Sequence, residues 1–252
     1  MLEIVDHPLQ IRELRLARPP ANALDPGLVA ALRAALAAAP GEGARALVVS
    51  GSPGLYSGGL DVPALLALER GTMTEFLGDF LALLGALALS EVPVVAAITG
   101  HAPAGGAVLA IHCDHRVMAD GEFVLGLNEV AVGIPLPRLI HSTLVRVVGR
   151  RQAERLGGRG LLVAPAEAAR IGLVDELALP AEVVPRALER AAEFLRLPER
   201  AMRETRRMAR ADLAEIFATE QRATWESFVD DWFSAETQRT LHALVVRLKT
   251  KG

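Results

Sequence analysis

The chain has 252 residues, of which 51% are hydrophobic and 4% aromatic, and its formal net charge is −3. The length and the hydrophobic fraction support a folded core, while the near-neutral charge argues against a protein dedicated to binding nucleic acid. The single cysteine, Cys113, excludes an intramolecular disulfide and fits a reducing compartment.

The N-terminal segment does not have the pattern of an export signal. Residues 1–6 carry acidic side chains early and lack a basic region followed by an apolar run. The most apolar stretch, residues 81–89, has about half of the length that a membrane crossing needs. We therefore expect a cytoplasmic protein without a membrane partner.

Short strand-like runs come first along the chain. Residues 11–16 alternate polar and apolar side chains, which is typical of a half-exposed strand. Residues 46–49 and 94–98 are wholly apolar and end in Ser-Gly and Thr-Gly, which favours buried parallel strands. Further strand candidates lie at 116–119, 123–125 and 174–177.

Helical segments separate these runs. Asp25 and Pro26 indicate a helix start, because aspartate caps free amides and proline at the first position wastes no donor. Beyond residue 180 only helices are predicted, including one over 182–195 and a last one opened by Ser234. The sequence predicts an α/β fold with parallel strands and crossover helices over residues 1–180, followed by a helical C-terminal region over residues 181–252.

Two glycine-rich turns follow the two most apolar strands. They span residues 51–61 and 100–106, and the second runs directly into an apolar helix. Neither turn has the dinucleotide or P-loop pattern, and Ser57 does not lie in a G-x-S-x-G elbow. Either turn alone is compatible with ordinary loop glycines. Together they can offer two backbone N–H groups to one anionic oxygen, as an oxyanion hole does.

Glu129 is the only ionisable residue between Phe123 and Leu136. A carboxylate among apolar neighbours is desolvated, which raises its pKa toward a value useful for proton transfer. A solvent-facing glutamate on a loop is the alternative that the pattern leaves open.

Two other signals carry less weight. His112 and His115 have a spacing that suits a metal site, but His115 is expected to begin a strand, so no metal is predicted. Arginines between 196 and 210 are interleaved with acidic residues, which favours a solvated helix face over a phosphate or RNA site.

Six segments, in this order, resemble the crotonase (enoyl-CoA hydratase/isomerase) family. The segments are RPPANAL at 18–24, YSGGLD at 56–61, APAGG at 102–106, CDHRVMAD at 113–120, GLNE at 126–129 and AEAARIGLVD at 166–175. The similarity extends from about residue 12 to the C-terminus. It implies an enzyme that acts on an acyl-coenzyme A thioester without a resident cofactor, assembled as a homotrimer or a dimer of trimers.

The resemblance also implies roles for individual residues. The N–H groups of Leu60 and Gly105 would hold the thioester oxygen, and Glu129 would act as the base. Arg18 is a candidate phosphate partner, with an ordinary surface arginine as the alternative. The expected substrate and coenzyme A contacts are Ala21, Ala23, Ser57, Gly58, Gly59, Leu60, Asp61, Gly105 and Asn128.

Val108 separates this chain from the hydratases of the family. Hydratases carry a second glutamate at this position, and valine cannot activate water. The motifs instead resemble the Δ3,Δ2-enoyl-CoA isomerase branch, in which alanine replaces Gly58. The resemblance implies that Glu129 takes a proton from carbon 2 of a 3-enoyl-CoA and returns it to carbon 4. A hydratase or other crotonase activity, and a catalytically weak coenzyme A-binding protein, remain alternatives.

Overall fold

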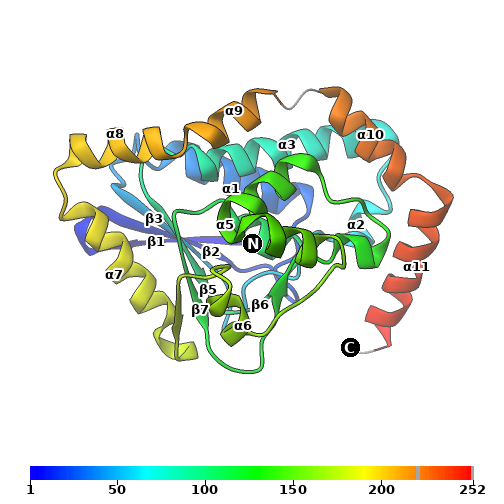
Figure 1. Ribbon diagram of the computed structural model, residues 1–252, viewed down its shortest axis with the longest axis horizontal. Helices are drawn as coiled ribbons and strands as arrows, with labels where there is room; N and C mark the ends of the chain where they lie inside the picture. The colour runs from blue at the N-terminus through cyan, green and yellow to red at the C-terminus, as the bar shows by residue number, and fades with distance from the viewer. Residues whose placement is uncertain (220–221, 251–252) are drawn as a thin grey trace.

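The computed structural model describes residues 1–219 and 222–250 and is built around a six-stranded sheet (Figure 1). Its strands, in spatial order, are β1 (Leu2–His7), β2 (Ile11–Leu16), β3 (Ala46–Ser50), β5 (Val94–Ile98), β7 (His115–Ala119) and β9 (Glu176–Ala178). Every pair from β2 to β9 is parallel, which confirms the predicted parallel core. The edge strand β1, which the sequence did not indicate, pairs antiparallel with β2.

A second sheet has three short parallel strands. These are β4 (Gly54–Leu55), β6 (Gly100–Pro103) and β8 (Leu125–Gly126), in the order β4-β6-β8. Each follows a strand of the large sheet in the chain, and β8 is shorter than the strand predicted at 123–125. Because the three strands are parallel, their carboxyl ends meet at one edge, which brings the segments after residues 55, 103 and 126 together.

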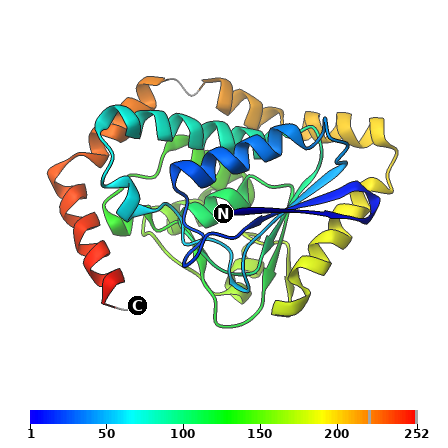
Figure 2. The ribbon, with the colours of Figure 1, turned by 180° about the vertical axis from the view of Figure 1, so that it is seen from behind.

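The two faces of the large sheet pack against different helices. One face packs on α7 (Val183–Leu195) through a separate cluster of small apolar side chains. The other face packs on α1 (Pro26–Ala38), α3 (Arg70–Ala88) and α4 (Gly105–Ile111) in the main core. Asp25 caps α1 by accepting a hydrogen bond of 2.8 Å from the amide of Leu28, as predicted. Figure 2 shows α1 and α3 side by side above the sheet.

Among the described residues, α3 is the one helix that is long and apolar enough to cross a membrane, judged by length and composition alone. With 19 residues, α3 is longer than the apolar stretch at 81–89, whose length was judged too short for a membrane crossing. In the structure α3 is an interior helix, because eight of its side chains are buried in the core: Met73, Phe76, Leu77, Phe80, Leu83, Leu84, Leu87 and Ala88.

Helices dominate the rest of the chain. They are α2 (Val62–Leu65), α5 (Arg138–Gly157), α6 (Pro165–Arg170), α8 (Glu199–Ala209), α9 (Ala211–Thr219), α10 (Arg222–Trp232) and α11 (Ala235–Lys249), with short 3-10 turns η1 (Pro8–Gln10), η2 (Glu129–Val132) and η3 (Pro180–Glu182). No strand among the described residues follows β9, as predicted. The domain boundary at residue 180 stays a prediction, and α7 packs directly on the sheet.

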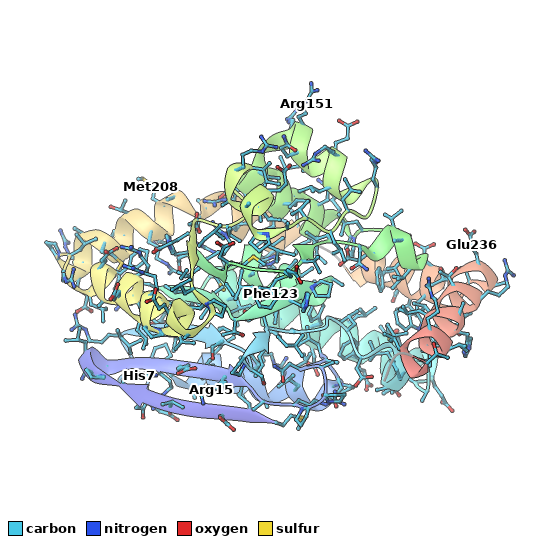
Figure 3. All side chains as sticks on the ribbon, turned by 90° about the horizontal axis from the view of Figure 1, so that it is seen from below. His7, Arg15, Phe123, Arg151, Met208 and Glu236 are labelled. Carbon is cyan, nitrogen blue, oxygen red and sulfur yellow. The ribbon has the colours of Figure 1, made fainter. Side chains whose placement is uncertain are left out.

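Viewed from below, β1 with His7 and its neighbour β2 with Arg15 form one side of the molecule, and α5 with Arg151 forms the opposite side (Figure 3). The last helix, α11, stands at one end and carries Glu236 on its outer surface. Ser234 caps α11 by accepting from the amide of Thr237, as the sequence indicated.

Candidate active site

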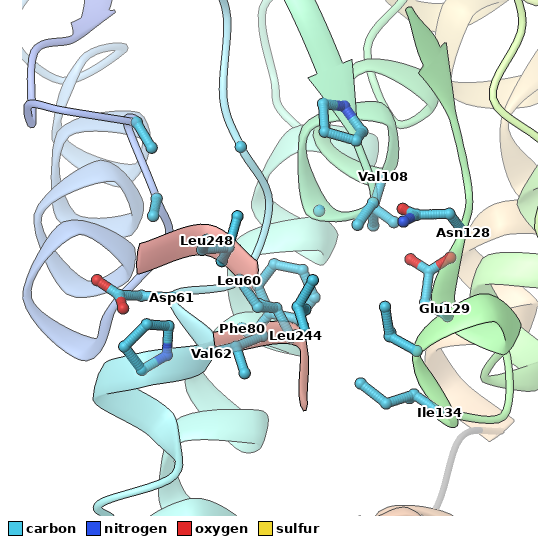
Figure 4. Close-up of a pocket in the computed structure, with 18 of the residues that line it drawn as sticks. Leu60, Asp61, Val62, Phe80, Val108, Asn128, Glu129, Ile134, Leu244 and Leu248 are labelled. Carbon is cyan, nitrogen blue, oxygen red and sulfur yellow. The ribbon is translucent and has the colours of Figure 1, made fainter. Parts of the chain in front are cut away.

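A cavity of about 710 Å³ lies between the ends of the small sheet and the C-terminal helices (Figure 4). Its volume is typical of a small-molecule site. Most of its lining is apolar. The lining residues that come from the predicted motifs are Arg18, Ala21, Ala23, Gly58, Leu60, Asp61, Ala104, Gly105, Val108, Asn128 and Glu129.

Asn22 fixes the first side of the cavity, although the sequence assigned it no role. Its Oδ1 accepts a hydrogen bond of 2.8 Å from the amide of Arg18. Its Nδ2 lies within bonding distance of the carbonyls of Leu55 and Tyr56. Its own carbonyl accepts from the hydroxyl of Ser57 at 2.8 Å. The buried Asn22 therefore joins the 18–24 loop to the first glycine turn.

The N–H group of Leu60 points away from Leu24, with which Leu60 forms an isolated parallel bridge. Leu24 donates to the carbonyl of Gly59 (2.8 Å) and accepts from the amide of Asp61 (3.1 Å). In such a parallel bridge both backbone groups of Leu24 bond to the residues flanking Leu60, so the N–H of Leu60 points to the opposite side. No hydrogen bond within the described part of the chain uses this N–H group.

The N–H group of Gly105 is also unused by any hydrogen bond of the described residues. Gly105 is the first residue of α4, where an amide has no partner one turn earlier. The preceding residue, Ala104, has φ 47°, a conformation that residues with a side chain rarely adopt. This strained position sets the direction in which α4 begins.

Gly59 and Gly105 place the two turns in direct backbone contact. A Cβ atom on Gly59 would lie 3.1 Å from the nitrogen of Gly105, and one on Gly105 would lie 3.2 Å from Cα of Gly59. A side chain at either position would push the turns apart. The structure thus brings the two predicted donors, Leu60 and Gly105, to the wall of one cavity.

Glu129 lines the same cavity, so the structure favours a buried carboxylate over the solvent-facing one that the sequence left open. Its Oε2 is buried and has no hydrogen-bond partner among the described residues, and the same holds for Oδ1 of Asn128. Burial raises the pKa of Glu129 from 4.5 to about 7, and a hydrogen bond from its own backbone amide opposes this rise only in part. Figure 4 shows both side chains opposite Leu60.

Val108 lies on α4, one turn after Gly105, and lines the cavity beside Asn128 and Glu129 (Figure 4). Val108 is therefore buried and close to the candidate base. Among the described lining residues, the other ionisable side chains are Arg18 and Asp61.

Arg18 is already engaged by protein groups. Its guanidinium forms ion pairs with Asp61 (2.7 Å) and Asp25 (3.1 Å) and donates to the carbonyl of Ala23 (3.2 Å). These contacts fix the loop that borders the cavity. A phosphate would have to exchange with one of the two carboxylates.

Most of the predicted contact residues lie on the cavity wall, but Ser57 and Gly59 do not. Both are buried beneath the turn. The hydroxyl of Ser57 donates to Asn22 and accepts from the amide of Gly59 at 3.2 Å. These two residues shape the turn whose exposed side is formed by Gly58, Leu60 and Asp61.

Part of the apolar wall comes from residues 62–90 and from the C-terminal helices, as expected, and the rest comes from residues 132–162, which the sequence did not indicate. The sequence could not single out the side chains, because an apolar helix stripe does not show which members meet a cavity. Those that do are Val62, Leu77, Phe80, Val132, Ile134, Ile140, Leu162, Phe228, Leu244, Val245 and Leu248.

The histidine pair lies outside the cavity. His112 is buried, donates from Nδ1 to the carbonyl of Val108 (2.7 Å) and has Nε2 at 3.3 Å from the hydroxyl of Thr143. Burial lowers the pKa of His112 to about 4, so the ring is neutral. Within residues 1–219 and 222–250, no group of three or more His, Cys, Asp and Glu side chains is placed to hold a metal ion.

Comparisons with known proteins show which proteins this chain is similar to. The sequence model of the enoyl-CoA hydratase/isomerase family matches residues 7–251. The mitochondrial enoyl-CoA delta isomerase 1 of Mus musculus is 30% identical over 247 residues, which cover 97% of this chain and 86% of that protein. A probable enoyl-CoA hydratase of Mycobacterium leprae is 32% identical over 192 residues, which cover 74% of this chain and 73% of that protein.

Similar solved structures also include both an isomerase and a hydratase. The crystal structure of human mitochondrial delta3-delta2-enoyl-CoA isomerase superposes with a TM-score of 0.95 at 29% identity, covering 99% of this chain and 98% of that one. An enoyl-CoA hydratase from Mycobacterium ulcerans superposes with a TM-score of 0.82 at 30% identity, covering 92% of this chain and 99% of that one.

Proposed function

Because this chain belongs to the enoyl-CoA hydratase/isomerase (crotonase) family, we propose that it is an isomerase that moves the double bond of a 3-enoyl-CoA to position 2. The observation that carries the proposal is the Glu129 carboxylate, whose Oε2 has no partner among the described residues, in an apolar cavity where Val108 occupies the position of a second acid. The similarity to the human mitochondrial delta3-delta2-enoyl-CoA isomerase, at a TM-score of 0.95, is compatible with this choice.

The thioester oxygen accepts hydrogen bonds from the N–H groups of Leu60 and Gly105. When a proton leaves carbon 2, negative charge develops on this oxygen, and donors that are already in place stabilise it without reorganisation. Removing one donor of this kind typically raises the barrier by ~2.7–4 kcal/mol. The contact between Gly59 and Gly105 supports this role, because it holds the two donors on adjacent backbones.

Glu129 moves the proton. As a carboxylate it takes the proton from carbon 2, and as a carboxylic acid it gives the same proton to carbon 4. The double bond shifts, no water is consumed, and the side chain returns to its starting state. A pKa of about 7 suits a group that must both accept and return a proton near neutral pH. Asn128 stands beside the carboxylate and helps to orient the thioester.

Coenzyme A lies along the first turn, near Ala21, Ala23 and Gly58, and serves as part of the substrate with no further cofactor. We also propose a cytoplasmic homotrimer or dimer of trimers. Light scattering on the purified protein measures the assembly.

The function is tested by adding a 3-enoyl-CoA and following the appearance of the conjugated 2-enoyl-CoA. We expect isomerisation, little hydration of 2-enoyl-CoA, and a loss of roughly 10²–10⁴-fold in kcat for Glu129→Gln. Glu122→Gln is the matched control, since Glu122 is an exposed acid a few residues earlier.

Each other outcome points to a different function. Full activity in Glu129→Gln would refute the mechanism. Hydration faster than isomerisation would favour a hydratase, the activity named for several relatives. Binding of enoyl-CoA without any turnover would favour a coenzyme A-binding protein.

A further inference from the structure

The turn that carries Glu129 has little anchorage of its own. No residue of η2 is fully buried as a whole: Val130 is 46% exposed, and Val132 is only partly buried against the main core. The turn is closed by backbone hydrogen bonds from Ala131 to Asn128 (3.0 Å), from Gly133 to Val130 (3.2 Å) and from Ile134 to Glu129 (3.0 Å). An element without buried apolar side chains opens easily, so the position of Glu129 depends on what packs against η2.

The last helix, α11, holds the C-terminal end of this turn. The hydroxyl of Thr237, a residue only 3% exposed, donates to the carbonyl of Gly133 at 2.6 Å. The hydroxyl of Ser234 donates in turn to Oγ1 of Thr237 at 3.1 Å. The contact therefore joins two segments that are 104 residues apart in the chain.

The backbones of the turn and the helix are also in close contact. Gly133 has φ 79°, and a Cβ atom placed on it would lie 3.4 Å from Cα of Thr237 and 3.3 Å from Cβ of Thr240. A side chain at Gly133 would be strained by the positive φ and crowded by α11. The close contact between the turn and α11 therefore requires a glycine at position 133.

The same helix forms part of the cavity wall. Leu244, Val245 and Leu248 line the cavity, and Figure 4 shows Leu244 and Leu248 across from Glu129. Thr237 and Leu244 share the inner face of α11, since they are seven residues apart. Leu248 is 53% exposed, so the far end of the helix is only lightly covered and the anchorage lies near Thr237.

We propose that Thr237 is a positioning residue for proton transfer: its hydrogen bond to Gly133 holds η2 against α11, which keeps the carboxylate of Glu129 aimed at the substrate and shielded from water. This inference rests on the proposed function. Thr237 itself does not line the cavity and acts through Glu129.

The test compares three variants. Thr237→Val keeps the branched shape and removes the hydroxyl, and Thr237→Ser restores it. Thr240→Val is the matched control, because the hydroxyl of Thr240 bonds only within α11, to the carbonyl of Glu236, while its Cβ packs on the same glycine. We expect kcat to fall roughly tenfold in Thr237→Val, with a smaller change in KM, and to stay near the wild-type value in the other two.

Two further measurements separate positioning from general destabilisation. In Thr237→Val, water reaches the carboxylate, so the pKa seen in the pH dependence of kcat/KM falls below that of the wild type. Hydrogen exchange at Gly133 and Ile134 accelerates in this variant only. All variants keep the titratable and charged side chains of the cavity wall, of the segments that flank η2 and of α11, including Arg18, Asp61, Arg138, Arg159, Glu236, Arg239, His242 and Arg247.

The inference would be overturned if Thr237→Val kept the kcat, the pH profile and the hydrogen-exchange rates of the wild type. It would also be overturned if Thr240→Val lost as much kcat as Thr237→Val, or if Thr237→Ser did not restore kcat. If Thr237→Val does not fold, Thr237→Ala provides the same comparison. A wild-type protein without isomerase activity would refute the proposed function, whereas the exchange rates would still show whether Thr237 holds the turn.

Discussion

The burial that makes Glu129 useful as a base also costs the folded protein stability. Its pKa is raised from 4.5 to about 7. Between these values the folded state keeps a proton that the unfolded state has released, so the free energy of unfolding falls as the pH rises from 4.5 to 7. The difference in pKa corresponds to about 3 kcal/mol.

We therefore predict that Glu129→Gln is more stable than the wild type at pH 8, by about 3 kcal/mol, and similar to it at pH 4. Glutamine has the shape of the protonated acid but never carries the buried charge. Urea unfolding of both proteins at the two pH values measures the difference, with Glu122→Gln as the exposed control. A stability difference that is independent of pH would contradict the raised pKa.

Val108 gives a prediction about reaction type. Val108→Glu places a second carboxyl group beside Glu129, and because two carboxylates in an apolar cavity resist joint ionisation, one of them stays protonated. This acid–base pair suits the addition of water. We expect hydration of 2-enoyl-CoA to rise and isomerisation to fall, measured with purified enoyl-CoA substrates. Val108→Gln is the control, because glutamine has the size of glutamate but no acidic group. Equal hydration activity in Val108→Glu and Val108→Gln would rule out an acid–base pair as the cause.

At the scale of elements, α7 shows how closely a helix packs on this sheet. Ala187 and Ala191 are fully buried against the face formed by β3, β5 and β7. Small side chains at these positions let the helix backbone approach the strands, and a larger one has no space.

Ala191→Leu is accordingly predicted to lower the free energy of unfolding by about 1–3 kcal/mol through overpacking. Activity at a permissive temperature should change little, because no residue of α7 is among those that line the cavity. Denaturant unfolding and an isomerase assay check both parts. Ala201→Leu, at an exposed position of α8, is the control and should be nearly neutral.

The elements also differ in how well the sequence predicted them. β2, β3 and β5 are five or six residues long with clear patterns, and their predicted and observed ranges agree closely. β4 and β8 have two residues each, which is too short for any periodicity. Their formation depends on pairing with β6, a contact between segments distant in the chain.

At the scale of the whole molecule, Asp114 ties the C-terminal helices to the core. Its carboxylate accepts from Arg206 and Arg210, each at 2.7 Å, and from the amide of Val94 at 2.8 Å. The side chains of Asp114 and Arg210 are only 6% and 10% exposed. A buried ion pair of this kind is sensitive to the loss of one partner, since the other charge stays buried.

Asp114→Ala is expected to destabilise the protein by about 3–5 kcal/mol, because Arg210 would lose its counter-charge. Glu204→Ala removes an exposed ion pair with Arg207 on the same helix and should cost at most about 1 kcal/mol. Urea unfolding of both variants gives the comparison. Similar losses in the two would mean that the Asp114 cluster contributes no more than a surface pair.

The sequence by itself determined the class of fold and the chemical groups of the candidate site. Short, wholly apolar runs encode buried strands locally, and Glu129 and the two glycine turns stand out by residue type alone. The tertiary structure decided where these groups point. Parallel pairing of three very short strands brings Leu60, Gly105 and Glu129 to one cavity, and α11 closes it from the far end of the chain. These contacts join residues far apart in sequence, and no local pattern records them.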